Sequence, residues 1–358
     1  MGLDILVGYA GSNPQAPGNV EQRDDGSFVV RPESEDGDSN YKFALDVTVR
    51  NTADSAQAMT LVVDWQEPPE VGTMYMPQRG TVFLINGPTC REVSGRLDQD
   101  QVSFQLNIPS GETRVCLHPP FWRAEIDAFF DEAAALGGMR IGYGQTAEDR
   151  KLEAAWLPAT GRAERCVLAI GRIHPYETAG SFFVAGLVDL LAAEEGRALR
   201  ENTAFILAPM VNPDGVAHGL CKRTTTGTEL SAQGVSSNDP AACALRGLVC
   251  GVAAGAPNAV LIDAHGWMIA QDGPIFYSTD LADTVLPQLS DELFANGFRV
   301  KGYSDRPADP GTTDLRRYAA EQLGVEVFVT SHPWFGRGAE DMRRIGAGLT
   351  GALLRSLC

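Results

Sequence analysis

The sequence changes its pattern near residue 145, and this change constrains the fold more than any other feature. Before it, short runs rich in Val, Phe, Leu and Thr alternate polar with apolar residues, as in KFALDVTVR, and turn clusters such as PESEDGDSN separate them. Short alternating runs between turns predict an antiparallel β-sandwich. A helix that stops at Gly137 and Gly138 follows these runs. The predicted strands are 27–31, 41–50, 59–65, 81–86 and 101–108, and the helix is 121–136.

Beyond residue 145, continuous apolar runs such as CVLAI alternate with helical patterns. This alternation predicts an α/β fold with a mixed, largely parallel sheet flanked by helices. The length of 358 residues favours two domains. We therefore expect an N-terminal antiparallel β-sandwich over residues 1–140 and the α/β domain over residues 141–358. Within the second domain the predicted strands are 166–170, 204–208, 259–262 and 325–330, and the predicted helices are 178–195 and 342–357.

The composition excludes several classes of function. Asp and Glu number 46 against 29 Lys and Arg, and the resulting net charge of −17 opposes binding to phosphate backbones or anionic lipid. No apolar run is long enough to span a bilayer, and the first residues lack a signal-peptide pattern. The seven cysteines, an odd number without a CxxC pair, indicate reduced thiols. We expect a cytoplasmic protein with no nucleic-acid or membrane partner, and its oligomeric state stays open.

Two of the five histidines come just after predicted buried strands: His174 follows CVLAI, and His265 ends AVLIDAH. The carboxyl ends of parallel strands form the usual ligand site of an open α/β sheet. Glu177 stands three residues after His174 where a loop enters a helix, so the two side chains share a face. Two histidines and a glutamate suit a catalytic zinc with one position open to water. An exposed loop histidine beside a glutamate that begins a helix is the alternative.

Three motifs in this order, HPYE, NPDGV and DAH, resemble the zinc carboxypeptidase family, and most closely its cytosolic, tubulin-deglutamylase-like branch. The resemblance implies a β-sandwich ahead of the peptidase domain and one Zn²⁺ per chain, held by His174, Glu177 and His265. It also implies that Asp214 of NPDG hydrogen-bonds a ligating histidine and so fixes its tautomer. A buried aspartate that closes its own turn is the alternative for Asp214.

The resemblance implies zinc-dependent hydrolysis of a peptide or amide substrate. After NPDG the family has an arginine that polarises the scissile carbonyl, and Lys222, with Arg223 beside it, takes that place here. Lysine keeps the charge but loses the planar guanidinium. Tyr318 follows GTTD, which is similar to the family's mobile tyrosine segment. A core or surface tyrosine on an amphipathic helix is the alternative for Tyr318.

Two departures from the family leave the activity open. The Asp-Leu-Asn-Arg run that binds the substrate carboxylate is Glu-Leu-Ser-Ala here, and Ser231 cannot replace a charge-assisted pair. The family's general base aligns with Ser331. Glu326, in the same strand, lies about five residues earlier, or roughly 15 Å. His332 titrates near neutral pH and is the other candidate base, with a capping or supporting role as its alternative.

These departures define two alternative functions. One is a zinc amidase or deacylase that acts on substrates without a free C-terminal carboxylate. The other is a catalytically inactive, zinc-binding family member. The acidic charge of the chain also counts against polyglutamate tails as the substrate, because like charges repel.

Overall fold

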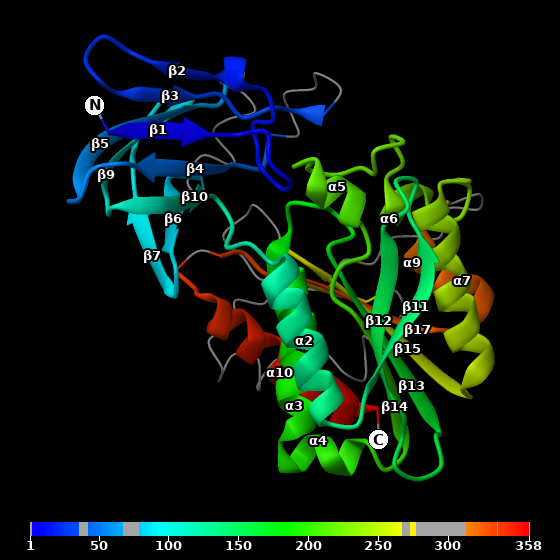
Figure 1. The fold of residues 1–358 in the computed structure, drawn as a ribbon. Helices are drawn as coiled ribbons and strands as arrows, with labels where there is room; N and C mark the ends of the chain where they lie inside the picture. The colour runs from blue at the N-terminus through cyan, green and yellow to red at the C-terminus, as the bar shows by residue number, and fades with distance from the viewer. Residues whose placement is uncertain are drawn as a thin grey trace. The chain divides into compact units, whose positions relative to one another are not determined.

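The computed structural model describes residues 2–35, 42–66, 79–266, 273–276, 313–334 and 336–357. The chain forms two compact units, drawn in Figure 1. The first comprises Met1–Pro120 with Gly215–Arg223, and the second comprises Phe121–Asp214 with Thr224–Cys358. The domain boundary between residues 140 and 141 stays a prediction of the sequence.

The first unit contains two five-stranded sheets. One has the order β1-β4-β10-β6-β7 and is antiparallel throughout. The other has the order β2-β3-β5-β9-β8 and is antiparallel except for the parallel pair β3–β5. The elements are β1 Leu3–Leu6, η1 Pro17–Asn19, β2 Val20–Gln22, β3 Phe28–Val30, β4 Asp46–Asn51, β5 Gln57–Asp64, β6 Thr81–Asn86, β7 Thr89–Ser94, β8 Arg96–Asp98, β9 Gln101–Ile108 and β10 Gly111–Cys116. The predicted antiparallel N-terminal sheets are confirmed, with that one parallel pair added.

The second unit is built on a seven-stranded sheet with the order β11-β12-β14-β13-β15-β17-β16. The four central strands run parallel, and the outer strands β11, β12 and β16 pair antiparallel. The predicted mixed, largely parallel sheet is confirmed. The strands are β11 Met139–Gln145, β12 Lys151–Leu157, β13 Arg165–Gly171, β14 Thr203–Ala208, β15 Asn258–His265, β16 Gly273–Phe276 and β17 Glu326–Ser331.

Helices cover both faces of this sheet (Figure 1). Helices α2, α3 and α10 pack on one face, and α7 and α9 pack on the other over an apolar core that includes Leu168, Leu245 and Val327. No helix of the described residues is long and apolar enough to cross a membrane. The helices are α2 Arg123–Ala135, α3 Thr178–Ala192, α4 Glu194–Leu199, α5 Pro213–Ala217, α6 Leu230–Gln233, α7 Pro240–Gly255, α9 Leu315–Leu323 and α10 Ala339–Ser356.

The strand order reverses direction beside β13. The next strand in sequence, β14, pairs with one edge of β13, and β15 pairs with the other. In open α/β sheets such a reversal opens a crevice at the carboxyl ends of the two diverging strands, and ligands bind there. A ligand site is therefore expected at the ends of β13 and β15.

Candidate metal centre

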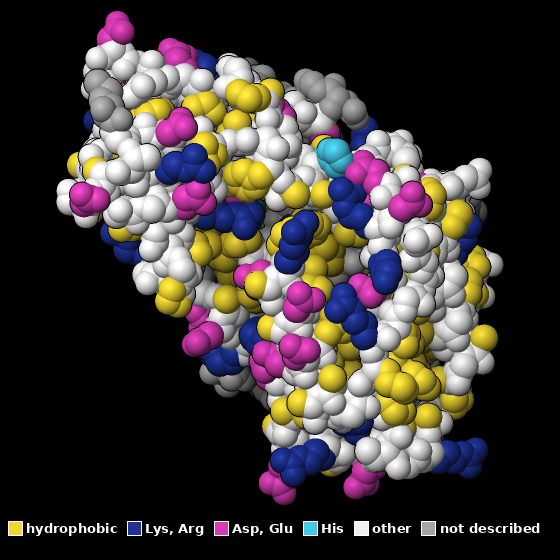
Figure 2. Space-filling model, viewed as in Figure 1, with side chains coloured by type: hydrophobic (Ala, Val, Ile, Leu, Met, Phe, Trp, Pro, Cys, Tyr) yellow, Lys and Arg dark blue, Asp and Glu magenta, His cyan; other side chains and the backbone are white. Residues whose placement is uncertain are grey.

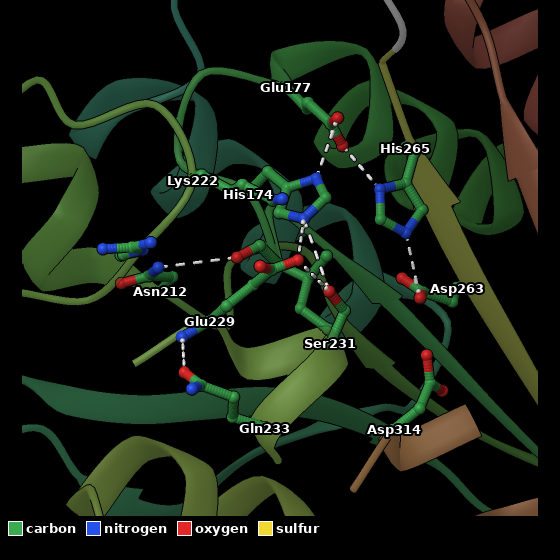
Figure 3. A network of polar contacts seen from close by, with 12 residues as sticks. His174, Glu177, Asn212, Lys222, Glu229, Ser231, Gln233, Asp263, His265 and Asp314 are labelled. Atoms are coloured by element: carbon green, nitrogen blue, oxygen red, sulfur yellow. Dashed lines mark hydrogen bonds and ion pairs between the residues drawn. The ribbon is translucent and has the colours of Figure 1, made fainter. Parts of the chain in front are cut away.

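The three predicted metal ligands come together at the ends of β13 and β15. The Nδ1 atom of His174 lies 3.0 Å from Oε1 of Glu177, and the Nδ1 atom of His265 lies 2.7 Å from Oε2 of the same carboxylate. Figure 3 shows both rings turned toward Glu177. One donor atom from each residue lies within 4.8 Å of the others, and all three side chains are buried. This spacing fits a single ion.

Local backbone geometry explains why Glu177 reaches the histidines. Glu177 is the N-cap of α3, and His265 is the last residue of β15. A Cβ atom on Gly180, in the first turn of α3, would lie 2.1 Å from the carbonyl oxygen of Ala264. Only glycine allows α3 to approach the strand end this closely. The small residue in the first turn of α3 thus brings a helix-borne carboxylate to a strand-borne imidazole.

Arg172 holds the turn that carries His174. Its backbone is in the left-handed region, with φ of 62°, directly after β13. The buried guanidinium donates from Nε to the carbonyl oxygen of Pro175 at 2.6 Å and from Nη1 to that of Phe121 at 3.0 Å. A strained residue of this kind persists only where its surroundings fix it. Arg172 therefore pins the loop between β13 and α3.

The charges of the triad suit a cation. Burial opposes ionisation of Glu177, but the two imidazoles outweigh it and hold its pKa well below the usual range. Burial likewise opposes the charge on His265, but Asp263 and Glu177 raise its pKa to about 10. The carboxylate thus lies between two proton-attracting rings. A divalent ion replaces such protons when it binds, and two nitrogens with a carboxylate are donors that zinc accepts. The residues present fit zinc.

Oxygen atoms also lie near the outer nitrogen of each ring, a feature that the sequence analysis missed. Nε2 of His265 lies 2.9 Å from Oδ2 of Asp263. Nε2 of His174 lies 3.4 Å from Oγ of Ser231 and 3.8 Å from Oε1 of Glu229. A carboxylate on this side fixes the tautomer of a metal-binding histidine. The signal for Asp263 was its place two residues before His265, on the same face of the strand.

Asp214 has different partners from those predicted. Its carboxylate accepts hydrogen bonds from Thr146 Oγ1 at 2.7 Å, from the Glu148 amide at 3.1 Å and from Arg150 Nη1 at 2.7 Å. Among the described residues no hydrogen bond joins it to a histidine, because these three donors already surround the carboxylate. Asp214 thus ties the NPDG segment to the turn that precedes β12.

Of the two predicted bases, Glu326 lies far from the triad, whereas His332 donates its backbone amide to the carbonyl oxygen of His265 at 3.1 Å and packs its ring against α3. Glu326 begins β17 opposite Val260, whereas the pairing of β15 with β17 puts Ser331 opposite His265. Glu326 is therefore at the other end of the strand. The ring of His332 stacks on Phe183 of α3, with 5.5 Å between centroids, and its Nε2 contacts the hydroxyl of Thr330. The buried Oγ of Ser331 has no hydrogen-bond partner among the described residues.

The remaining predicted residues lie in both units: Lys222 and Arg223 in the first, and Ser231 and Tyr318 in the second. Ser231 is buried on α6 and contacts His174, as noted above. Tyr318 of α9 directs its hydroxyl to Cys250 of α7, 3.7 Å away. Lys222 and Arg223 belong to the first unit, where both backbone amides donate to Oε1 of Glu35. Their action on a substrate at the triad stays a prediction.

Sequence comparisons support the predicted resemblance. Residues 139–239 match the family model described as zinc carboxypeptidase. Cytosolic carboxypeptidase 6 of Mus musculus and that of Homo sapiens are 31% and 36% identical to this chain over 177 residues, which cover 47% of it. The matched segment spans only 30% and 33% of those two proteins. The predicted likeness to zinc carboxypeptidases, with cytosolic carboxypeptidases among the relatives, is confirmed.

Solved structures share the fold over the full length of the chain. A metallo-carboxypeptidase from Burkholderia cenocepacia superposes with a TM-score of 0.83 at 16% identity, covering 100% of this chain and 99% of its own. A metallo-carboxypeptidase from Pseudomonas aeruginosa, in complex with (2-guanidinoethylmercapto)succinic acid, gives a TM-score of 0.80 at 17% identity and covers 99% of both chains. At these identities the likeness establishes the fold.

Proposed function

We propose, on the premise that this chain carries a zinc carboxypeptidase domain, that it is a zinc-dependent metallohydrolase that cleaves a peptide or amide bond. The proposal rests on the buried set of His174, Glu177 and His265, which lies at the ends of β13 and β15, where the strand order reverses. When bound there, one zinc ion per chain supplies a Lewis acid that activates water and polarises the carbonyl of the substrate.

The chain's own residues take the following parts in this proposal. His174 and His265, which turn their Nδ1 atoms to Glu177, would offer those atoms to the ion, and Glu177 would offer a carboxylate that is already ionised at neutral pH. Lys222 or Arg223 stabilises the negative charge that develops on the carbonyl oxygen. We assign proton transfer to neither Glu326 nor His332, because one lies at the far end of β17 and the other stacks on Phe183.

A second candidate function is a zinc amidase or deacylase whose substrate lacks a free carboxylate. Ser231 favours it. Its hydroxyl donates to Oε1 of Glu229 at 3.1 Å, and Ser231 and Ala232 stand where the family has its Asn-Arg pair, so this run offers an acid but no cation to a substrate carboxylate. A substrate carboxylate next to Glu229 would meet repulsion instead of a bidentate pair. The serine at position 331 favours a third candidate, an inactive zinc-binding member of the family, because it offers no carboxylate for proton transfer.

The test is a hydrolysis assay on zinc-loaded protein with matched peptides that have free or amidated C-termini. Cleavage of free peptides alone supports a carboxypeptidase, and cleavage of amidated or acylated substrates supports the amidase. No turnover by a protein that binds one zinc supports the inactive member. His265→Ala serves as the control, because activity that persists in it does not come from this site.

We also propose that the protein acts in the cytoplasm on a peptide or amide substrate. The relatives described above are named cytosolic carboxypeptidases, and the six described cysteines are free thiols. Fractionation of the native cells, followed by immunoblotting, tests the location.

A further inference from the structure

The carboxylate of Asp263 is buried close to one of the candidate metal ligands. Asp263 precedes His265 by two residues on β15, so both side chains leave the same face of the strand. Its side chain is 0% exposed, and Oδ2 lies 2.9 Å from Nε2 of His265. Among the described residues neither oxygen of Asp263 has an aligned hydrogen-bond partner. A buried carboxylate in this condition is unfavourable for folding and calls for an explanation.

An arginine fixed from a second element faces the same carboxylate. Nη1 of Arg316 lies 3.8 Å from Oδ2 of Asp263. The guanidinium is itself held by Asp314, the N-cap of α9, through Nη2 at 2.7 Å and Nε at 3.2 Å. Figure 3 shows Asp263 on the side of His265 that faces away from Glu177. Asp263 therefore lies between the outer nitrogen of His265 and a cation anchored by α9.

We propose that Asp263 is a positioning residue for zinc binding, with Arg316 offsetting part of its buried charge. A neutral imidazole carries one N–H, and a carboxylate beside Nε2 draws that proton to the outer nitrogen. The lone pair of Nδ1 then faces the metal, and the ring becomes a stronger donor. The inference rests on the zinc centre proposed above and concerns how His265 is prepared for it.

Asp263→Asn tests the role, because the amide keeps the shape of the side chain and removes the charge. We expect zinc affinity, measured by competition with a chelator at fixed pH, to fall by about 10- to 100-fold. The visible absorption of bound Co²⁺ should shift, since the donor strength of His265 changes. Asp263→Ser, a smaller replacement, provides a second variant that should show the same loss if the asparagine variant folds poorly.

Asp46→Asn is the matched control. Asp46 is a mostly buried aspartate of the first unit that pairs with Arg114 at 2.6 Å. Its loss should lower the thermal stability of the metal-free protein and leave the dissociation constant for zinc unchanged. This control separates the general cost of removing a buried carboxylate from an effect on the metal.

The outcomes distinguish this inference from the proposed function. Weaker zinc binding in both Asp263 variants, with wild-type affinity in Asp46→Asn, supports the positioning role. Wild-type affinity in either folded Asp263 variant, even with lower metal-free stability, would overturn it and leave the zinc centre standing. A wild-type protein that binds no zinc would overturn both.

Discussion

Strands β15 and β17 end side by side, with His265 opposite Ser331, but the two strand ends present different side chains. The end of β15 presents an imidazole with a fully buried aspartate behind it. The end of β17 presents a serine whose hydroxyl has no hydrogen-bond partner among the described residues. The end of β15 offers a candidate metal ligand, whereas the end of β17 offers no carboxylate for proton transfer. We therefore expect metal binding and hydrolysis to be separable at this site.

The largest effect is expected from replacing one histidine of the candidate metal site. His265→Ala, or His174→Ala, should reduce bound zinc from about one ion per chain to near zero, because two protein ligands hold zinc far more weakly than three. Metal analysis after dialysis measures the stoichiometry. His118→Asn, in the first unit, is the control and should keep the ion. Full zinc retention in both alanine variants would remove the site from the proposal.

The second largest effect is expected from adding a carboxylate at the end of β17. Ser331→Glu places a carboxylate opposite His265, and we expect peptide hydrolysis by the zinc-loaded protein to rise by roughly 10²-fold, the lower end for general-base catalysis. Ser331→Gln has the same size without the charge and is the matched control. Equal rates for the two variants would mean that the absent carboxylate does not limit the reaction.

The third effect is expected from a substitution that displaces α3, the helix at whose start Glu177 stands. In Gly180→Ala the new methyl group would overlap the carbonyl oxygen of Ala264, so α3 must shift and carry Glu177 with it. We expect about 1–3 kcal/mol of destabilisation and weaker zinc binding. Gly251→Ala in α7 is the control, since nothing lies within 4 Å of its new Cβ atom. That variant should gain about 0.5–1 kcal/mol. Chemical denaturation and chelator competition measure both quantities.

The smallest effect concerns the aspartate that anchors Arg316. Burial raises the pKa of Asp314, but hydrogen bonds from Arg316 and from the backbone of α9 outweigh burial and leave the pKa below its usual value. A lowered folded-state pKa contributes stability above the unfolded value of about 3.9, and that stability is lost as pH falls through the folded value. Asp314→Asn should therefore cost about 1 kcal/mol at pH 7 and progressively less below about pH 4. A difference independent of pH in denaturant unfolding would contradict this assignment.

Among the elements that the sequence predicted correctly are those that a continuous apolar run marks as deeply buried. The CVLAI strand became β13, and the helix predicted from residue 178 became α3. The missed strands lack that signal. In β7, Thr89–Ser94, nearly every residue is exposed, and β11, Met139–Gln145, contains two glycines. Such strands are fixed by pairing with distant partners, which a local pattern does not record.

The three candidate ligands could be selected from the sequence because His174 follows a buried strand, His265 ends another and Glu177 stands where a helix begins. The surroundings of these residues could not be predicted. The partners of Asp214 lie in the turn at residues 146–150, more than 60 positions away in sequence. Glu229, the N-cap of α6, lies 3.8 Å from His174 although the two residues are far apart in the sequence. Contacts of this kind depend on tertiary packing and on a strand order that no single motif encodes.

The start of α3 at Thr178 has an electrostatic consequence. The aligned peptide dipoles of a helix give about half a positive charge at its first turn. Gly180 brings that turn against the end of β15, so this partial charge lies beside the Glu177 carboxylate. Glu177 is thereby preorganised as an anion, and we expect any protons released on zinc uptake to come from the two imidazoles. Calorimetric titration in buffers of different ionisation enthalpy would count those protons and so report the histidines alone.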